Sequence, residues 1–451
     1  MRVNPVKIDT LLEARWVIPV EPAGAVFHDH AVAIDQGMIR AILPRDEAHV
    51  QFEPRERVVL NRHVLIPGLI NLHTHAAMSL MRGMGDGLPL MEWLTSHIWP
   101  AEAKHVDAGF VFDGTRLACA EMLQGGVTCF NDMYLFPEAA ARAALVSGMR
   151  AGIGMLAIDF PTAYASDPDD YLTKGLALRD DYNLHPLLSF CFAPHAPYTV
   201  GDKNLSRLLT YAEQLDVPIH IHLHETGDEI RNSLKSHGMR PLERMHKLGL
   251  LGPNLIAVHM VHLTEGEIEL LAQQGCSVAH CPSSNLKHAS GLAPVTALIE
   301  AGVNVGLGTD SAASNSRLKM FEEMRLAALL AKGQSGRAEV LPAWQVLQMA
   351  TLNGARALGL GDRIGSLVPG KAADIAAVDF SSLDLVPCYD PVSHLVYAAG
   401  REHVSHVWVN GKMLLRDGEL TTLDREELLH RAEFWREQMA TGVIAVHENN
   451  G

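Results

Sequence analysis

Two histidines separated by one residue, His73 and His75, are the residues in this chain best suited to chemistry. They stand at the end of a long apolar run, 64–72, which is typical of a buried strand. Residues i and i+2 of a strand point to the same side about 6.6 Å apart, so both imidazoles can reach one cation at about 2.0–2.1 Å each. The same pair also occurs as ordinary polar residues at a strand end, so the rest of the chain must decide between these interpretations.

Other ionisable residues also stand at the ends of apolar, strand-like runs. A single histidine at such a position usually has only a structural role. A group that gathers at one end of a sheet is better explained as a site, because chance would place histidines at both ends of the strands. In chain order these residues are His195, His222, His224, Glu225, His259, His262 and Asp310.

Histidine and aspartate together suggest a catalytic divalent metal. Three or four nitrogen and oxygen ligands with one open position are typical of catalytic Zn²⁺ or Fe²⁺ sites rather than of closed structural sites. Such an ion lowers the pKa of a bound water toward about 7 and supplies hydroxide at neutral pH, which indicates a hydrolytic reaction. Hydrolysis also needs groups that carry protons, and Asp310 and Glu225 are the available carboxylates.

Spacing alone does not fix the ligand set. His220, His222 and His224 share one face of the same predicted strand, so alternation cannot choose the ligand among them. Glu225 has the opposite parity and can face the metal only if the strand has already ended. The predicted strand at 187–195 contains no lysine, so it cannot supply a carbamylated lysine that would bridge two metals, and this favours one ion.

The elements that position these residues alternate between strand-like and helical patterns. Such alternation predicts a parallel sheet. Eight strands that close on themselves form a (β/α)8 TIM-like barrel, whose active sites lie at the carboxyl ends of the strands, where the ionisable residues gather. The predicted strands are 64–75, 127–133, 150–158, 187–195, 218–225, 255–262, 276–285 and 304–311, and the predicted helices are 110–125, 137–147, 205–215, 265–274 and 295–301.

The two ends of the chain have a different pattern. Segments 31–43 and 403–415 alternate apolar and polar residues around the turn signals at 35–37 and 410–411, which predicts hairpins outside the barrel. A helical pattern with charges on one face follows near the C-terminus. The predicted domains are 1–64 with 363–420 as a small β-sandwich, 65–362 as the catalytic barrel and 421–451 as a C-terminal helical extension.

Composition indicates a globular protein that acts on a small molecule. Of the 451 residues, 48% are apolar and 20% are charged, and the formal net charge of −15 with no run of basic residues argues against nucleic acid or an anionic membrane as partner. No stretch of eighteen apolar residues predicts a membrane span, and residues 1–20 lack the pattern of a secretory signal, so we expect a cytoplasmic protein. The six cysteines form no CxxC pair and are expected to be reduced and mostly buried.

At these residues the chain resembles the amidohydrolase superfamily, and within it the 5′-methylthioadenosine/S-adenosylhomocysteine deaminases. The resemblance covers nearly the whole chain. The strings HTH, HLHET and GTDS are specific for the superfamily, and the long loop after the first strand, from PGLINLHTH to WPAE, selects the subfamily. The matching segments are 67–102, 193–200, 222–226, 258–263, 280–287 and 306–325.

The resemblance implies a role for each candidate residue in the reaction. One Zn²⁺ per subunit is expected, although Fe²⁺ suits the same ligands. Glu225 would protonate the purine N1, His259 would polarise the attacking water, and Asp310 would accept the proton of that water and help to deliver one to the leaving amine. The implied metal ligands are His73, His75, His222 and Asp310.

The resemblance also implies the substrate. The 6-amino group of an adenosine-type nucleoside would be replaced by oxygen, with ammonia released. Glu102 would bind the ribose hydroxyls, His195 would contact the purine or ribose, and Trp93 would wall the pocket unless it is simply a core aromatic. A homo-oligomer is expected from the family alone.

One feature of the substrate is left open by the sequence. The carboxylate of S-adenosylhomocysteine needs a cation, but Arg150 starts its strand, at the wrong end of the barrel, and Arg82 is only a weak substitute. The choice among 5′-methylthioadenosine, S-adenosylhomocysteine and adenosine therefore stays open.

Two other functions remain as alternatives. The same metal site would serve a deaminase or chlorohydrolase of a ribose-free ring such as guanine or a triazine, and Glu102 distinguishes this case because such a ring has no hydroxyls for it to bind. A barrel that has lost catalysis and serves as a scaffold is the second alternative, which the complete set of ligands and proton carriers argues against.

Overall fold

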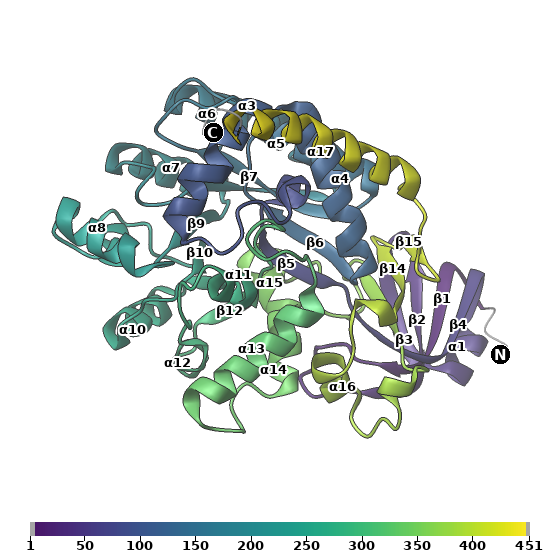
Figure 1. Ribbon diagram of the computed structural model, residues 1–451. Helices are drawn as coiled ribbons and strands as arrows, with labels where there is room; N and C mark the ends of the chain where they lie inside the picture. The colour runs from purple at the N-terminus through teal and green to yellow at the C-terminus, as the bar shows by residue number, and fades with distance from the viewer. Residues whose placement is uncertain (1–4, 448–451) are drawn as a thin grey trace. The chain divides into compact units, whose positions relative to one another are not determined.

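The structure is a computed structural model that describes residues 5–447, and side chains up to residue 440 (Figure 1). The chain forms two compact units that do not follow chain order. The boundary between the units passes through two strands of the parallel sheet, so these units do not test the predicted domain limits. The first unit comprises Met1–Asn71, Met122–Cys129 and Lys319–Thr421, and the second comprises Leu72–Glu121, Phe130–Leu318 and Thr422–Gly451.

The first unit contains a mixed sheet built from both ends of the chain. Its strand order is β16-β15-β14-β13-β4-β1-β2-β3. Strands β1 and β4 are parallel, and their other neighbours pair antiparallel. This confirms a separate β structure formed by both chain ends. The strands are β1 Val6–Val17, β2 Phe27–Asp35, β3 Met38–Pro44, β4 Phe52–Pro67, β13 Ile375–Asp379, β14 Val404–Val409, β15 Lys412–Arg416 and β16 Glu419–Leu420.

Two tight hairpin turns of this sheet lie against each other. Gln36 and Gly37 have φ of 52° and 77°, and Asn410 and Gly411 have φ of 50° and 74°, which is the left-handed pair that a type I′ turn requires. The two turns touch, because a Cβ on Gly411 would lie 2.8 Å from the Cα of Gly37. The close approach of the two turns explains why glycine is needed at both positions.

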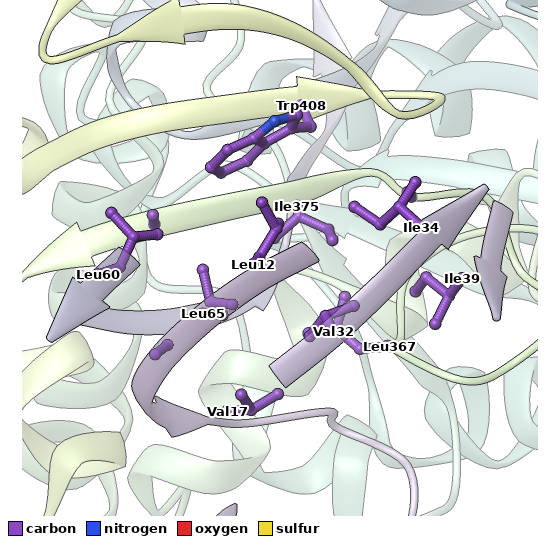
Figure 2. Packing of buried hydrophobic residues seen from close by; sticks show 13 residues of the cluster. Leu12, Val17, Val32, Ile34, Ile39, Leu60, Leu65, Leu367, Ile375 and Trp408 are labelled. Carbon is purple, nitrogen blue, oxygen red and sulfur yellow. The ribbon is translucent and has the colours of Figure 1, made fainter. Parts of the chain in front are cut away.

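The sheet encloses an apolar core. Leu12, Val32, Ile375 and Trp408 come from four different strands, and each is at most 1% exposed. Figure 2 shows their side chains pointing toward one another. Core positions such as Val32 and Ile34, or Ile375 and Ala377, are two residues apart, so a slip of one residue would turn them to the other face.

The parallel sheet is the predicted barrel. Its order, β12-β11-β10-β9-β8-β7-β6-β5, follows the chain without interruption. The first and last strands meet at their carboxyl ends, where the amide of Asp310 donates to the carbonyl of His73 at 3.0 Å. The sheet is therefore nearly closed, and the (β/α)8 fold is confirmed. The strands are β5 Leu69–Thr74, β6 Val127–Asp132, β7 Arg150–Ala157, β8 Leu188–Pro194, β9 Ile219–Leu223, β10 Leu255–His259, β11 Ser277–His280 and β12 Asn304–Leu307.

The first predicted strand, 64–75, is in fact two strands. Its beginning belongs to β4 of the mixed sheet, and Gly68 separates it from β5. A side chain at Gly68 would lie 2.1 Å from the side chain of Thr128, so the backbone can pass there only as glycine. Both strands are buried, and a continuous apolar run therefore could not reveal where one ends and the next begins.

Four helices, α6, α8, α10 and α16, begin at a residue whose side chain caps the first turn. Thr264 and Glu267 form a capping box at the start of α10, and Asp167 accepts two backbone N–H bonds at the start of α6. The helices are α1 Arg45–Gln51, α2 Leu90–Trp93, α3 Trp99–His105, α4 Ala108–Gln124, α5 Pro137–Ser147, α6 Pro168–Tyr182, α7 Asp202–Leu215, α8 Gly227–His237, α9 Pro241–Lys247, α10 Glu265–Gln274, α11 Pro282–Lys287, α12 Val295–Glu300, α13 Met320–Ser335, α14 Ala343–Met349, α15 Leu352–Ala357, α16 Pro391–Tyr397 and α17 Arg425–His447.

The helix α17 belongs to the second unit and packs against α4. Its Trp435 and Arg431 both donate to the carboxylate of Asp113 on α4, at 2.9 Å and 2.8 Å. None of the helices in the described part of the chain combines the length and hydrophobicity that a membrane span requires. Residues 448–451 of the predicted extension lie outside the described residues.

Candidate metal centre and active site

The ionisable residues at the strand ends meet in one buried cluster in the second unit. His73 ends β5, His222 lies in β9, His259 ends β10, and Asp310 follows β12. All four are at most 5% exposed. Buried polar side chains need partners, so the contacts within this cluster decide what it can hold.

Two groups of three side chains in this cluster are close enough to hold an ion, His73 with His222 and His259, and His73 with His75 and Asp310, and they share His73. The Nε2 atoms of His73 and His222 are 3.2 Å apart. One carboxylate oxygen of Asp310 lies 3.4 Å from the Nε2 of His73 and 3.4 Å from that of His75. Two ligands bound to one ion at about 2.1 Å would lie about 3.0–3.4 Å apart. The observed distances therefore fit one divalent metal.

The outer nitrogens of two of these histidines are already used. Nδ1 of His75 donates to the carbonyl of Met133, and Nδ1 of His222 donates to the carbonyl of His195 at 2.7 Å. A neutral imidazole that donates from Nδ1 has only a lone pair on Nε2. These bonds therefore direct two lone pairs toward the centre of the cluster, as the supporting partners of metal-bound histidines do.

His220 is the hydrogen-bond partner of the outer nitrogen of His73. Its Nε2 lies 2.9 Å from the Nδ1 of His73, and its Nδ1 lies 3.1 Å from the side-chain amide of Asn131. His224 follows the strand, and its Nδ1 donates to the backbone of His262 instead. Of the three histidines that alternation could not separate, His222 is the one whose Nε2 lies next to the Nε2 of His73.

A turn at the end of β9 brings Glu225 to the same face. His224 has a left-handed φ of 55°, which breaks the alternation of the strand. The carboxylate of Glu229 fixes this turn, because it accepts the backbone N–H of His224 at 3.0 Å and of Glu225 at 2.8 Å. Glu225 is 6% exposed and lies 3.7 Å from Nε2 of His259. Burial and the nearby Asp310 raise the pKa of Glu225 to about 8.

Asp310 and His259 are held by neighbours on α11. Both have left-handed backbones, with φ of 59° and 74°, which is unusual for residues other than glycine. Ser284 donates to Asp310 at 2.6 Å, and Nδ1 of His259 lies 2.8 Å from the Oδ1 of Asn285. Burial opposes ionisation of Asp310, but the bond from His73 and the surrounding imidazoles hold its pKa well below the usual range.

A cavity of about 450 Å³ opens beside this cluster. Its size suits a small organic molecule, and its lining is mainly apolar with a few polar groups. Glu102 lines it and accepts a hydrogen bond from the hydroxyl of Tyr134 at 2.8 Å. Burial raises the pKa of Glu102 to about 7. The cavity thus has a carboxylate at one part and the histidine cluster at another.

Trp93 and His195 complete the wall of this cavity. The indole of Trp93 is 3% exposed, and its N–H donates to the carbonyl of Met84 at 2.8 Å, so Trp93 is both a buried aromatic and a lining residue. Nδ1 of His195 lies 3.0 Å from the hydroxyl of Thr199. Burial and neighbouring imidazoles lower the pKa of His195 to about 3, so it is neutral at pH 7.

Several supporting residues were not singled out from the sequence. Ser284 and Asn285 lie in the CPSSN string directly after a predicted strand, which could have drawn attention to them. Glu229 lies four residues after Glu225 in the first turn of a helix, a weaker signal. Tyr134 had no signal, because its contact with Glu102 joins segments that are distant in the sequence.

A barrel with this cluster at the carboxyl ends of its strands defines a metal-dependent hydrolase of the amidohydrolase type. The model of the Amidohydrolase family matches residues 64–414, and the chain belongs to this family. This confirms the superfamily that the sequence motifs indicated.

Individual relatives are similar over nearly the full length. A protein of Teredinibacter turnerae named 5-methylthioadenosine/S-adenosylhomocysteine deaminase is 49% identical over 97% of this chain and 99% of its own length. The crystal structure of an adenosine deaminase from Xanthomonas campestris with bound Zn superposes with a TM-score of 0.96 at 50% identity, covering 97% of this chain and 100% of that one. The zinc complex of atrazine chlorohydrolase TrzN from Arthrobacter aurescens TC1 has a TM-score of 0.88 at 25% identity, covering 94% and 99%.

Proposed function

We propose that this protein is a metal-dependent deaminase that replaces the 6-amino group of an adenosine-type nucleoside with oxygen and releases ammonia. The names of the Teredinibacter and Xanthomonas relatives support this proposal. The observation that carries it is one cavity that is lined by the histidine cluster with Glu225 and also by Glu102. The carboxylate of Glu102 can accept hydrogen bonds from the hydroxyls of a ribose.

We propose one Zn²⁺ per subunit as the metal, with Fe²⁺ suited to the same ligands. His73, His75, His222 and Asp310 would hold it, because His73 has a donor atom 3.2 Å from His222 and 3.4 Å from Asp310, and Asp310 is also 3.4 Å from His75. When bound, the ion lowers the pKa of a water and provides a nucleophile at neutral pH. No lysine of β8 is available to bridge a second ion.

Glu225 and Asp310 would divide the proton transfers between them. With its pKa raised to about 8, Glu225 is mostly protonated at pH 7 and can donate to the purine N1, which makes C6 more electrophilic. Asp310 is ionised and can accept the proton of the attacking water, then pass it to the departing amine. Two carboxyls whose environments push their pKa values apart are the usual basis for such a division.

His259 would orient the attacking water. Its Nδ1 faces the carbonyl oxygen of the Asn285 side chain, so the tautomer that donates there leaves Nε2 as an acceptor. Glu102, oriented by Tyr134, would accept hydrogen bonds from the ribose 2′ and 3′ hydroxyls. Trp93 and His195 would flank the nucleoside.

The location and the partners of the protein are inferred from its charge and from the family. We propose a cytoplasmic homo-oligomer without nucleic acid or membrane partners, in line with the net charge of −15. None of the six cysteines, all at positions that the structure describes, forms a disulfide, and only Cys388 is not buried.

The test is a steady-state assay of ammonia release from the purified enzyme. The substrates are 5′-methylthioadenosine, adenosine, free adenine, guanine and a chlorotriazine, the last assayed for chloride. We expect the two nucleosides to have the highest kcat/KM. Faster turnover of guanine or the triazine than of every nucleoside would overturn the proposal in favour of a ribose-free ring, and no turnover with a full complement of metal would favour a scaffold.

A further inference from the structure

The helix that carries Glu102 has little anchoring of its own. This helix, α3, has seven residues, and none of them is fully buried. The hydroxyl of Tyr134 donates to the carboxylate of Glu102 at 2.8 Å, but this contact orients one side chain rather than the helix. Most of the stability of a helix in a protein comes from packing against its neighbours, so the position of α3 depends on the elements that it touches.

The helix α3 is joined closely to α4, the helix that follows it. Only Val106 and Asp107 separate the two helices, and the backbone N–H of Val106 donates to the carbonyl of Glu102 at 3.1 Å. The carboxylate of Asp107 accepts a hydrogen bond from the backbone N–H of Phe110 at 2.8 Å, in the first turn of α4. The start of α4 therefore fixes the point at which α3 ends.

The C-terminal helix α17 packs on the first turns of α4. The indole of Trp435 lies against the ring of Phe110, with the ring centroids 5.2 Å apart and the planes at 78°. Its N–H donates to the carboxylate of Asp113 at 2.9 Å, and the same oxygen accepts a bond from Arg431 at 2.8 Å. Residues three apart in a helix share one face, so Phe110 and Asp113 both belong to the face that meets α17.

A buried carboxylate, Asp113, is a main point of attachment between these two helices. Carboxylates are seldom buried unless they are paired, and Arg431 and Trp435 of α17 are two of its partners. One turn further along α4, Arg116 donates to the carboxylate of Glu427 at 2.9 Å and 2.8 Å. These bonds join residues 311 to 322 positions apart, so specific polar contacts as well as apolar packing hold α17 on α4.

The helix α17 also contacts α3 directly. Figure 1 shows α17 running along α4 toward α3. Gly109, at the very start of α4, faces the indole of Trp435, because a Cβ at this glycine would lie 3.7 Å from the indole ring. Trp435 thus covers the turn of α4 that adjoins α3, and a shift of α17 should move the end of α3.

The metal ligand His75 is held by the barrel rather than by α17. The helix α17 does contact the 3-10 helix η1, Ala76–Met81, which follows this ligand. However, the backbone N–H of Ala76 donates to the carboxylate of Asp132 on β6 at 2.7 Å, and Nδ1 of His75 donates to the carbonyl of Met133. A change at α17 should therefore affect α3 more than it affects the metal ligands.

From these contacts we infer that Trp435 and Arg431 are positioning residues for the reaction, because by fixing the start of α4 they hold Glu102 where it can bind the ribose. Neither side chain is among those that line the cavity, so the effect passes through α4 and α3 rather than through contact with the substrate. The inference rests on the proposed function, since it requires a nucleoside whose ribose Glu102 binds.

The first test removes the contact between α17 and α4 and measures ammonia release from adenosine. Trp435→Ala deletes the ring and its N–H donor, whereas Trp435→Phe keeps a ring that can pack on Phe110. We expect Trp435→Ala to raise KM by about tenfold and to leave kcat within about twofold, since displacing a binding group by about 1 Å is enough for an effect of this size. Trp435→Phe should recover most of the loss. Leu429→Ala, at a position of α17 that is 51% exposed, is the control and should leave KM unchanged.

A double-mutant cycle shows whether the effect passes through Glu102. If Trp435 acts by placing Glu102, then Trp435→Ala should raise KM in the wild type but not in the Glu102→Ala background. An equal rise in both backgrounds would overturn the inference, because Trp435 would then act by another route. A lower Tm with an unchanged KM would overturn it as well, because Trp435 would then only stabilise the fold.

A milder variant keeps the test decisive if Trp435→Ala does not fold. The side chain of Arg431 is 36% exposed, so Arg431→Gln removes one bond to Asp113 without opening the core. We expect it to raise KM for adenosine by about twofold to fivefold, the scale of a partly exposed ion pair, and to have no effect in the Glu102→Ala background. An unchanged KM in a folded Arg431→Gln variant would contradict the role of Arg431.

Failure of the proposed function would look different. In that case Glu102→Ala alone would bind adenosine as well as the wild type does, or no nucleoside would be turned over at all. Either result would refute the function on which the inference rests, whatever the variants of α17 do.

Discussion

The mixed sheet and the mouth of the barrel are both buried, but they are built in opposite ways. The core of the sheet is apolar, with Leu12 and Trp408 almost completely buried. The mouth buries histidines and carboxylates, and three of its residues, His224, His259 and Asp310, have left-handed backbones. The comparison indicates that the sheet is organised for stability, whereas the mouth holds strained, polar groups that only a function explains.

Loss of a metal ligand should produce the largest effect on activity. Asp310→Asn keeps the size of the side chain but removes both the ligand charge and the proton acceptor. We expect kcat to fall by at least about 10³-fold, within the range for a positioned acid–base group, while circular dichroism stays unchanged. Asp228→Asn is a matched control, because its exposed carboxylate bonds only to Arg231 among the contacts seen here and should leave kcat within about twofold. Near-normal turnover by Asp310→Asn would remove this residue from the mechanism.

Loss of the proton donor should have the next largest effect. Glu225→Gln preserves the shape of the side chain and leaves the four proposed ligands in place. We expect it to keep its metal, measured by inductively coupled plasma mass spectrometry, and to lose at least about 10²-fold in kcat. A variant that loses its metal as well would mean that Glu225 holds the ion rather than a proton.

The turn that carries Glu225 offers a finer test. Glu229→Leu removes the acceptor for the amides of His224 and Glu225, whereas Glu229→Gln keeps one oxygen that can accept them. We expect kcat to fall by about 10-fold to 100-fold in the leucine variant, no more than the loss expected when the acid Glu225 is itself removed, and to recover partly in the glutamine variant. KM should change little in either, because Glu102 is untouched. Equal losses in the two variants would indicate a general packing defect.

Ionisation of Glu102 should make substrate binding depend on pH. Burial raises its pKa to about 7, so the carboxyl is ionised above pH 7 and protonated below it. Only the ionised form can accept bonds from both ribose hydroxyls, so KM for adenosine should rise as the pH falls from 8 to 6. In Glu102→Ala this rise should disappear and KM should be high throughout. A KM for adenosine that is independent of pH in the wild type would refute the ribose assignment.

The sheet should respond in the opposite way, with a change in stability and none in chemistry. Trp408→Ala leaves a large void in the apolar core and should lower the free energy of unfolding by about 3–5 kcal/mol, measured by urea denaturation. The kcat per folded molecule should stay unchanged. Val50→Ala, at a site 75% exposed, is the control and should change stability by less than about 0.5 kcal/mol.

The same contrast explains what the sequence could predict. The hairpin at Asn410 and Gly411 and the existence of the eight barrel strands follow from local periodicity and turn residues, although the predicted strand 276–285 ends at His280 and continues as α11. The split of the first strand at Gly68 could not be predicted, because it depends on the close approach of Thr128.

Some residues of the site could be predicted from the sequence and others could not. His73 and His75 are visible from their spacing after a strand, since alternation alone puts them on one face. The turn that redirects Glu225 depends on the left-handed backbone of His224, and the pairing of Glu102 with Tyr134 joins two distant segments. Neither feature leaves a local pattern in the sequence.

The most direct test of the metal centre is the metal content of protein purified without chelators. The four proposed ligands predict one equivalent of Zn²⁺ or Fe²⁺ per chain, loss of ammonia release when a chelator removes it, and recovery when one equivalent is restored. Full activity of metal-free protein, or a requirement for two equivalents, would contradict the account.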